Sequence, residues 1–165
     1  MQRSFKKALI TGGCGFIGSC LIRNLLQNSS IEILNLDKMG YASREEGITN
    51  LFKDNNLLRN KYNFLKIHLK DKDKLEKIIY KYKPDLVIHL AAESHVDKSI
   101  VDPSSFVINN IIGTTNLLEV LLEYWRNLIP QLKNNFCFLH VSTDEVFGSL
   151  SGNNKFTENS SYSPN

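Results

Sequence analysis

The chain has 165 residues, a length that accommodates one domain with a sizeable core and leaves little room for a second. Its 20 Lys and Arg residues and 17 Asp and Glu residues give a formal net charge of +3, and these charges are interspersed along the chain. Blocks of like charge are typical of nucleic-acid-binding arms and membrane-binding patches. The charge pattern therefore predicts neither kind of partner.

The N-terminal region does not resemble a targeting or membrane segment. The basic residues Arg3, Lys6 and Lys7 precede an apolar run at 8–10 that is too short for the core of a signal peptide. The longest largely apolar stretch, residues 86–92, is much shorter than the roughly 20 residues of a membrane helix. We therefore expect a soluble protein.

Cysteine and histidine positions indicate neither a disulfide framework nor a metal site. The three cysteines form no even set and no Cys-x-x-Cys pair, which favours a reducing compartment: Cys14, Cys20 and Cys137. The four histidines lack the spacing of metal ligands: His68, His89, His95 and His140. We predict a cytoplasmic protein without a bound metal.

Five short runs rich in Ile, Leu, Val and Phe predict β-strands. Most of them lack strict alternation of apolar and polar residues, which is typical of parallel strands that are buried on both faces. The runs cover residues 7–11, 31–36, 63–69, 85–90 and 136–141.

Helical patterns separate these strands. Residues 16–27 place Ile17, Leu21 and Leu25 on one face, and we expect this face to pack on the sheet. Residues 71–82 carry apolar side chains at helical spacing and should pack in the same way: Leu75, Ile78, Ile79 and Tyr82.

The longest predicted helix begins at Asp102 and Pro103, a capping carboxylate followed by proline at the first helical position. It extends to about residue 128, and Pro130 then ends it. We expect its inward face to consist of Val107, Ile111, Leu118, Leu122 and Trp125.

The alternation of strands and helices predicts an α/β fold with a Rossmann-like, doubly wound parallel sheet. We assign residues 1–148 to this domain. Residues 149–165 are rich in Ser, Asn and Gly, and we interpret them as a loop tail.

A glycine-rich motif, Thr11-Gly12-Gly13-Cys14-Gly15-Phe16-Ile17-Gly18, follows the first predicted strand and opens the first helix. In such a motif, Gly12 or Gly13 permits the tight turn, and Gly15 lets the backbone approach a pyrophosphate. Gly18 allows the helix to pack closely on the strand. The motif therefore predicts a dinucleotide site.

An acidic residue, Asp37, ends the second predicted strand about 20 residues after the motif. A carboxylate in this place accepts hydrogen bonds from the ribose hydroxyls of NAD and repels the extra phosphate of NADP. Lys38 follows directly and can weaken this discrimination. We predict NAD as the cofactor.

A polar loop follows the fourth predicted strand, at the edge where open α/β sheets bind ligands. Ala91 and Ala92 are small enough to leave space for a cofactor. Ser94, His95 and Asp97 could be taken for a nucleophilic triad, but they are too close in sequence for that geometry. We expect polar contacts from this loop to a nicotinamide or a substrate.

Thr143, Asp144 and Glu145 follow the fifth predicted strand and should lie at the same edge. Adjacent residues of an extended strand point to opposite faces, so both carboxylates serve one site only if the chain turns, as Gly148 allows. In a dry cleft, neighbouring carboxylates have pKa values that move apart, which provides a proton donor and a base for eliminating water. A solvated acidic turn is the alternative.

Six segments, in order, resemble the dTDP-glucose 4,6-dehydratases of the extended short-chain dehydrogenase/reductase family over essentially the whole chain. They are TGGCGFIGS, LDKMGYAS, KPDLVIHLAAESHVDKSI, NNIIGTTNLLE, HVSTDEVFG and FTENSSYSP. The glycine loop is common to the superfamily, whereas ESHVD and STDEV point to sugar-nucleotide dehydratases. The resemblance implies a tightly held NAD that oxidises carbon 4 of a hexose, loss of water across carbons 5 and 6, and return of hydride to carbon 6.

The resemblance also implies residue roles. Thr143 would hydrogen-bond the sugar near carbon 4, Asp144 would protonate the leaving hydroxyl, and Glu145 would take the carbon 5 proton. Ser94 and His95 would face the sugar nucleotide. The residues implied to line NAD are Phe16, Ile17, Asp37, Lys38, Ala91, Ala92 and Ser94.

Several positions depart from the family pattern. His68 and Leu69 stand where the family usually has an Asp that contacts adenine, so this contact is altered or lost. Asn109 replaces a Thr that approaches the cofactor, and Phe147 replaces a Tyr. The family's Tyr-x-x-x-Lys pair begins beyond residue 165, and Tyr162 cannot replace it because no Lys can follow four residues later.

Two classes of function therefore stay open. In one, the chain is the N-terminal part of a dehydratase that needs a C-terminal continuation, with a related nucleotide-sugar epimerase or decarboxylase as the alternative enzyme. In the other, it is a non-catalytic NAD-binding module. We expect no turnover by residues 1–165 alone. A homodimer through the helix at 102–128 is a further expectation, because dimers of the family use helices of this domain.

Overall fold

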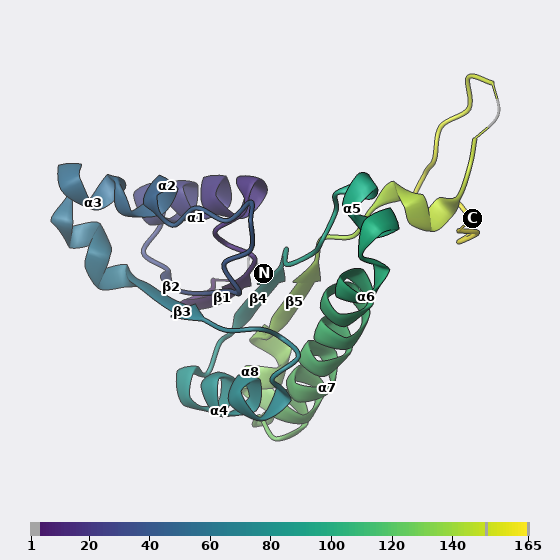
Figure 1. The fold of residues 1–165 in the computed structure, drawn as a ribbon. Helices are drawn as coiled ribbons and strands as arrows, with labels where there is room; N and C mark the ends of the chain where they lie inside the picture. Colours follow the sequence, from purple (N-terminus) through teal and green to yellow (C-terminus); the bar gives the residue numbers. More distant parts are fainter. Residues whose placement is uncertain (1–3, 151, 165) are drawn as a thin grey trace.

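The computed structural model describes residues 4–150 and 152–164. Arg3 of the basic N-terminal group and residues 151 and 165 of the tail lie outside this range. Within it, five parallel strands form one sheet in the order β3-β2-β1-β4-β5 (Figure 1). Their bounds are β1 (Lys7–Thr11), β2 (Glu32–Asp37), β3 (Tyr62–Lys66), β4 (Leu86–His89) and β5 (Cys137–His140).

The strand order reverses between β1 and β4. The chain first builds outward from β1 through β2 to β3, and then returns to place β4 on the other side of β1. In open parallel sheets, ligands bind outside the carboxyl ends of the strands at such a switch point. The predicted doubly wound sheet is confirmed, and its topology locates the crevice beside Thr11.

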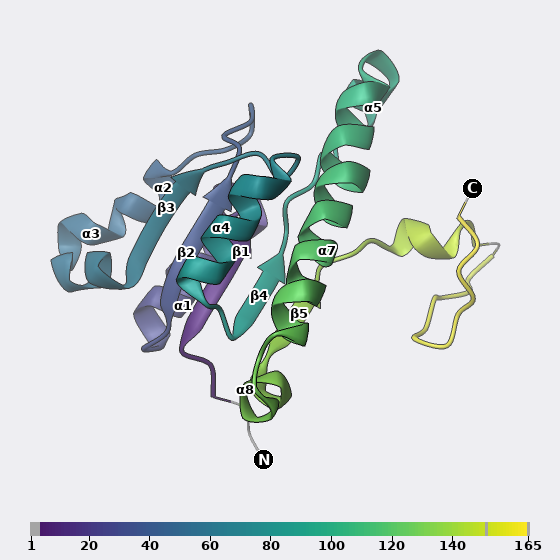
Figure 2. The same ribbon diagram turned by 90° about the horizontal axis from the view of Figure 1, so that it is seen from below.

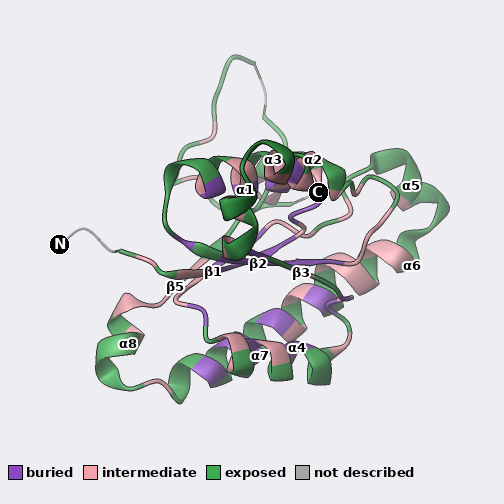
Figure 3. Cartoon of the chain, turned by 90° about the vertical axis from the view of Figure 1, so that its left-hand side faces the viewer, coloured by how far each residue is buried: buried purple, intermediate pink, exposed green. Residues whose placement is uncertain are grey.

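Helices cover both faces of the sheet (Figure 3). One face carries α1 (Phe16–Asn28), α2 (Glu46–Thr49) and α3 (Leu51–Asp54). The opposite face carries α4 (Lys72–Tyr82), α7 (Gly113–Arg126) and α8 (Pro130–Asn135).

Each face of the sheet has its own apolar core. On β1, Leu9 belongs to the cluster beneath α4 and α7, whereas Ala8 and Ile10 belong to the cluster beneath α1. All three side chains are fully buried. Burial on both faces explains why these strands show no strict polar alternation.

The predicted buried face of α1 is confirmed in part. Leu21 and Leu25 are half-buried and pack against the core cluster, whereas Ile17 is 62% exposed and the fully buried residues are Gly18, Ile22 and Leu26. A Cβ at Gly18 would lie 2.4 Å from the carbonyl oxygen of Gly12, so this glycine lets the helix approach the loop closely. The centre of the buried face is therefore one residue farther along the helix than the predicted one.

The long helix forms as predicted but includes a π-helical segment. It consists of α6 (Pro103–Phe106), the π-helix η2 (Val107–Ile112) and α7. Asp102 caps its start by accepting a hydrogen bond from the Ser105 N–H at 3.2 Å. Pro130 does not end α7 but opens α8, the next short helix.

The inward face predicted for this helix is wrong. The residues that are buried are Gly113, Leu117, Val120, Leu121 and Tyr124. The predicted face is already exposed at Val107, the first residue of η2, so it lies away from the core from its first residue onward. All five residues predicted to point inward are at least 40% exposed: Val107, Ile111, Leu118, Leu122 and Trp125.

Short elements make up the remaining regular structure. η1 (Asn56–Lys61) precedes β3, α5 (Val96–Val101) follows β4, and the 3-10 helix η3 (Asp144–Phe147) follows β5. These segments are too short for periodicity to be recognised in the sequence. The tail at 149–150 and 152–164 contains turns without a helix or strand, and its Phe156 and Tyr162 pack on Phe147.

One helix of the described residues, Pro103–Arg126, is long and apolar enough to cross a membrane when judged by length and composition alone. Polar residues interrupt its apolar run in the sequence, so no long apolar stretch predicted it. Core helices of soluble proteins meet the same criterion. In this helix the composition reflects two apolar faces, one on the core and one exposed.

Candidate cofactor site

The glycine loop is folded tightly against the end of β4. Gly12 has a φ of +72°, and a Cβ there would lie 2.7 Å from the backbone of Ala91. A residue with a side chain would be strained and would clash with backbone atoms that cannot move aside. The tight turn of the motif therefore lies at Gly12, and not at Gly13.

The first turn of α1 offers free backbone donors. Gly15 is the N-cap residue, and among the described residues no side chain caps this helix end. The first turn also carries no acidic residue. A helix N-terminus combines free N–H groups with partial positive charge, so this end is suited to a phosphate group.

Asp37 connects the glycine loop to the loop after β2. It is 6% exposed, and its Oδ2 accepts the Cys14 N–H at 2.9 Å. Its Oδ1 accepts the Met39 N–H at 2.8 Å and the Ser43 hydroxyl at 2.9 Å. These bonds fix the carboxylate in one orientation at the end of β2.

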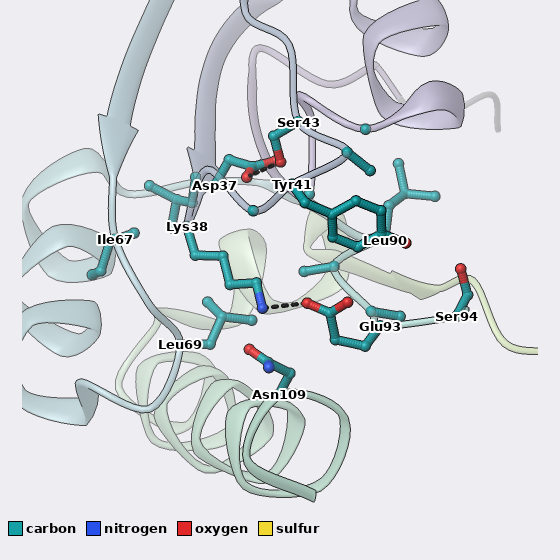
Figure 4. A pocket seen from close by; sticks show the side chains of 17 residues that line it. Asp37, Lys38, Tyr41, Ser43, Ile67, Leu69, Leu90, Glu93, Ser94 and Asn109 are labelled. Carbon is teal, nitrogen blue, oxygen red and sulfur yellow. Dashed lines mark hydrogen bonds and ion pairs between the residues drawn. The ribbon is translucent and has the colours of Figure 1, made fainter. Parts of the chain in front are cut away.

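A cavity of about 140 Å³ opens at the carboxyl ends of the strands, next to Asp37 (Figure 4). Loops that follow β1, β2, β3 and β4 form its wall together with η2. It brings together nine of the residues predicted for the cofactor or substrate: Gly12, Gly15, Asp37, Lys38, Leu69, Ala91, Ala92, Ser94 and Asn109.

Other predicted residues lie outside this cavity. Phe16 is 93% exposed at the first turn of α1, and Ile17 is also exposed. Gly18 packs on the loop backbone. His68 lines a neighbouring cavity that shares Lys38 with the first, and burial together with the nearby cations Lys70 and Lys38 lowers the pKa of His68.

An ion pair crosses the cavity. The Lys38 side chain extends from the end of β2 toward Glu93 in the loop after β4, and its Nζ bonds Glu93 Oε1 (Figure 4). The Lys38 and Glu93 side chains are 31% and 14% exposed. No local sequence pattern indicated a role for Glu93.

The π-helical segment holds the Glu93 backbone. The Asn110 side chain accepts the Glu93 N–H at 2.8 Å and donates to the Glu93 carbonyl oxygen at 2.8 Å. These two bonds replace the pairing that a strand would supply after β4 has ended. The irregular turn of η2 thus places one asparagine, Asn109, on the cavity wall and the next on the loop.

An aromatic contact joins the same two loops farther out. The Lys98 Nζ lies 2.8 Å from the centroid of the Tyr41 ring, and the His95 ring approaches Tyr41 edge-on with centroids 6.3 Å apart. A cation over an aromatic face is attracted by the ring quadrupole. The loop after β2 is therefore attached to the loop after β4 at two places.

A buried histidine supports the site from below. His89 is 1% exposed, and its Nδ1 lies 2.6 Å from the Thr11 hydroxyl while its Nε2 lies 3.0 Å from the Thr114 hydroxyl. Burial, and then the proximity of His140, lowers the pKa of His89 to about 4. A neutral imidazole thus links β1, β4 and α7.

A second buried polar group lies behind the glycine loop. The Asn35 side chain donates to the Tyr62 hydroxyl at 3.0 Å and to the Cys14 sulfur at 3.3 Å. Burial, followed by the nearby Asp37, raises the pKa of Cys14 to about 12. The thiol therefore stays protonated and acts as a packing group.

The predicted acid/base residues lie apart from the cavity. Thr143 caps η3 by accepting the Glu145 N–H at 3.3 Å, and its hydroxyl lies 3.4 Å from Asp144 Oδ1. All three residues are exposed, so the described residues do not form the dry cleft that the sequence argument assumed. In Figures 1 and 2, η3 lies beyond the β5 edge of the sheet, away from α1.

The described ranges contain no group of three or more His, Cys, Asp or Glu side chains that could hold a metal ion. Instead of belonging to a group of this kind, the His140 ring stacks on the His89 ring, with ring centroids 5.2 Å apart. The arrangement as a whole is suited to a dinucleotide, because it combines a helix N-terminus, a fixed carboxylate at the end of β2, and small residues after β4.

Comparison with known families agrees with this crevice. The family described as GDP-mannose 4,6 dehydratase matches residues 9–165, nearly the whole chain. The chain belongs to this family. Sequence relatives include the dTDP-glucose 4,6-dehydratase of Salmonella typhimurium, which is 42% identical over 167 residues covering 96% of this chain and 45% of the relative. The enzyme of the same name from Haemophilus influenzae is 46% identical over 157 residues, covering 94% of this chain and 45% of that protein.

Solved structures show the same fold. A dTDP-glucose 4,6-dehydratase from Bacillus anthracis in complex with NAD superposes with a TM-score of 0.76 at 30% identity, over 97% of this chain and 44% of that one. The Streptomyces venezuelae enzyme gives a TM-score of 0.78 at 32% identity, over 96% and 46%. The chain thus spans less than half the length of these family members. The resemblance to the dTDP-glucose 4,6-dehydratases and the Rossmann-like fold are confirmed.

Proposed function

We propose that the chain is the NAD-binding part of a dTDP-glucose 4,6-dehydratase. The observation that carries this proposal is the crevice at the strand switch point, in which Gly15 at the start of α1 and Asp37 at the end of β2 line one cavity. The identity of more than 40% to relatives with that name supports the substrate class. We assign residues 1–148 to the NAD-binding unit and residues 149–165 to a segment that leads to a C-terminal continuation.

The residues present fit NAD. In this proposal the pyrophosphate lies at the first turn of α1, beside Gly15, and Asp37 accepts the ribose hydroxyls. Ala91 and Ala92 leave room for the nicotinamide half. When bound there, NAD would supply the hydride transfer between carbon 4 and carbon 6 of the sugar. His68 carries no carboxylate, so the acidic adenine contact of the family is altered or lost here, and the His68 Nδ1 accepts the Lys70 N–H at 3.2 Å.

The chain's own residues would carry the elimination. Asp144 donates a proton to the hydroxyl leaving carbon 6, Glu145 removes the proton from carbon 5, and these two transfers release one water molecule. Thr143, Ser94 and His95 hold the sugar nucleotide. Because Asp144 and Glu145 are exposed in the described residues, this proposal requires the continuation to cover them and exclude water.

The test is a titration of the purified chain with NAD. We expect NAD to raise the melting temperature, because a ligand that binds only the folded state stabilises it. Asp37→Asn removes the charged acceptor of the ribose hydroxyls, so it should weaken NAD binding by about tenfold or more, measured by isothermal titration calorimetry. The matched control is Asp54→Asn, at an exposed position of α3.

The same preparation tests activity. Residues 1–165 alone should not convert dTDP-glucose to the 4-keto-6-deoxy sugar, because catalysis requires groups that this part of the family does not carry. Measurable conversion by the isolated chain would overturn that expectation. Absence of any NAD effect on melting would overturn the cofactor assignment.

A second enzyme function has one observation in its favour. A UDP-Glc/GlcNAc 4-epimerase from Campylobacter jejuni superposes with a TM-score of 0.78 at 27% identity, over 96% of this chain and 43% of that one. The pair Asp144-Glu145 argues for a dehydratase, because an epimerase has no water to eliminate. A non-catalytic NAD-binding module is the remaining alternative.

Assembly and location belong to the same proposal. An exposed apolar stripe on the long helix favours a homodimer, with Ile111, Leu118, Leu122 and Trp125 at the interface. All three cysteines are free thiols, which suits the reducing cytoplasm: Cys14, Cys20 and Cys137.

A further inference from the structure

The Lys38–Glu93 ion pair determines which charges the cofactor cavity presents. Among the described residues that line this cavity, Lys38 is the one Lys or Arg side chain, and Asp37 and Glu93 are the acidic ones. Because Lys38 is bonded to Glu93, the negative charge of Asp37 has no cation to balance it within the cavity.

The ion pair is held firmly on its acidic side. Asn110 forms hydrogen bonds with both the N–H and the carbonyl oxygen of Glu93, so the Glu93 backbone cannot shift without breaking two bonds. The Glu93 side chain is 14% exposed. Screening by solvent is weaker there than on the open surface, so the pair is stronger than a typical surface ion pair.

The position of Lys38 matters for the choice of dinucleotide. NADP differs from NAD by a phosphate on the ribose 2′-oxygen, and a cation near the acidic residue at the end of β2 accommodates that phosphate. Lys38 directly follows Asp37 and lines the same cavity. A free Lys38 ammonium would be a partner for the phosphate. A paired Lys38 can bind the phosphate only after its ion pair with Glu93 has broken.

Among the described residues, the other cations of this region do not line the cofactor cavity. Lys66 and Lys74 line the neighbouring cavity together with Lys38. Arg44, by contrast, points its Nη1 at the carbonyl oxygens of Tyr41 and Ser43, at 3.0 and 2.8 Å. Lys38 is therefore the cation whose availability decides how the cavity treats a 2′-phosphate.

We propose that Glu93 is a specificity-determining positioning residue that withholds Lys38 from a 2′-phosphate and so keeps the site selective for NAD over NADP. This inference rests on the proposed function, because it presupposes that the cavity holds the adenosine half of a dinucleotide. It adds a second determinant to the direct repulsion by Asp37.

The test compares NAD and NADP binding by isothermal titration calorimetry for the 165-residue chain and for Glu93→Gln. Glutamine keeps the size of the side chain and leaves both Asn110 bonds to the backbone in place, but it removes the charge that holds Lys38. We expect the ratio of the NADP to the NAD dissociation constant to fall by about tenfold, because one charged contact of this kind is worth roughly that factor.

Two further variants show whether the change in this ratio depends on the Lys38 ammonium. Lys38→Met in the Glu93→Gln background should restore the original ratio, since the gain in NADP binding requires a free ammonium. The matched control is Glu119→Gln, which breaks the exposed Lys72–Glu119 ion pair, neither member of which lines the cavity, and should leave the ratio unchanged. A merely structural role for Glu93 would change the two dissociation constants in parallel and leave their ratio constant.

The outcomes separate this inference from the cofactor proposal. The inference is wrong, while the cofactor proposal stands, if the wild-type chain binds NAD and Glu93→Gln leaves the ratio of the NADP to the NAD dissociation constant unchanged. The same holds if the double variant keeps the gain in NADP binding. If the wild-type chain binds neither dinucleotide, the cofactor proposal itself is wrong and the inference falls with it.

Discussion

His89 shows how one buried polar residue can tie several elements together. Its two ring nitrogens lie within hydrogen-bonding distance of the hydroxyls of Thr11 and Thr114. The Thr11 hydroxyl also accepts the Ala91 N–H at 3.4 Å. A protonated ring would have to donate at both nitrogens inside an apolar layer, so the folded chain favours the neutral form.

This preference makes stability depend on pH. The pKa of His89 falls from 6.5 to about 4 on folding, so the unfolded chain binds the extra proton more readily between these values. The free energy of unfolding is therefore highest above pH 6.5 and should decrease by about 3 kcal/mol as the pH is lowered toward 4. Urea unfolding at a series of pH values measures this slope.

The variant His89→Gln isolates the contribution of this ring. This variant should remove most of the decrease in the free energy of unfolding between pH 6.5 and 4. His95→Gln, at an exposed position, should retain that decrease. The lowered pKa of His68 contributes with the same sign in every variant and so cancels in the comparison. An unchanged slope in His89→Gln would show that folding does not lower the pKa of His89.

At the scale of elements, the join between β1 and α1 depends on glycine at positions where the backbone comes closest. A Cβ on Gly18 would meet the Gly12 carbonyl oxygen at 2.4 Å and the Gly13 Cα at 2.7 Å, and both are main-chain atoms. No rotation of a side chain can relieve these contacts. The helix would have to move away from the loop, and its first turn would move with it.

We predict that Gly18→Ala lowers the free energy of unfolding by about 2 kcal/mol or more, a typical cost of overpacking, and abolishes NAD binding. Urea unfolding and the NAD melting shift measure the two effects. Gly47→Ala is the control, because a Cβ in α2 would lie 3.6 Å from the nearest atom and alanine favours a helix. Equal stability of the two variants would show that the loop tolerates a wider spacing.

At the scale of the whole molecule, the long helix has two apolar faces. One face packs on α4 and the sheet through Leu117, Leu121 and Tyr124. The other carries a stripe at nearly the same angle around the helix, and its members are 40–60% exposed: Ile111, Leu118, Leu122 and Trp125. An exposed stripe of this kind is typical of a protein–protein interface.

We predict that the chain self-associates through this stripe and that Leu122→Glu weakens the association by at least tenfold, because it places an unpaired charge in an apolar interface. Sedimentation velocity over a range of protein concentrations measures this self-association. The control is Leu57→Glu, which changes an apolar residue that is 75% exposed in η1. A wild-type chain that sediments as a monomer at every concentration would contradict this prediction.

Much of the fold was predictable because it depends on neighbours in the sequence. β1 and the start of α1 follow from an apolar run that ends in glycines. β3 is shorter than predicted, because Ile67 and Leu69 leave the sheet to line the cavity while remaining buried. An apolar residue predicts burial, but it does not show whether a strand or a loop provides that burial.

The candidate site was predictable in part for the same reason. The glycine loop and Asp37 carry a motif with a fixed spacing, so their meeting at one cavity could be expected. The role of Glu93 could not, because its partner Lys38 is 55 residues away and its backbone is held by Asn110. No local pattern indicates contacts of this kind.

Local sequence is enough to establish the parallel α/β architecture, the glycine turn and the acidic residue at the end of β2, since each depends on backbone preferences and periodicity within one segment. The tertiary structure alone decided which face of the long helix is buried, that Lys38 pairs with Glu93, and that His89 joins Thr11 to Thr114. These features depend on distances between residues far apart in the chain, which only the packed structure defines.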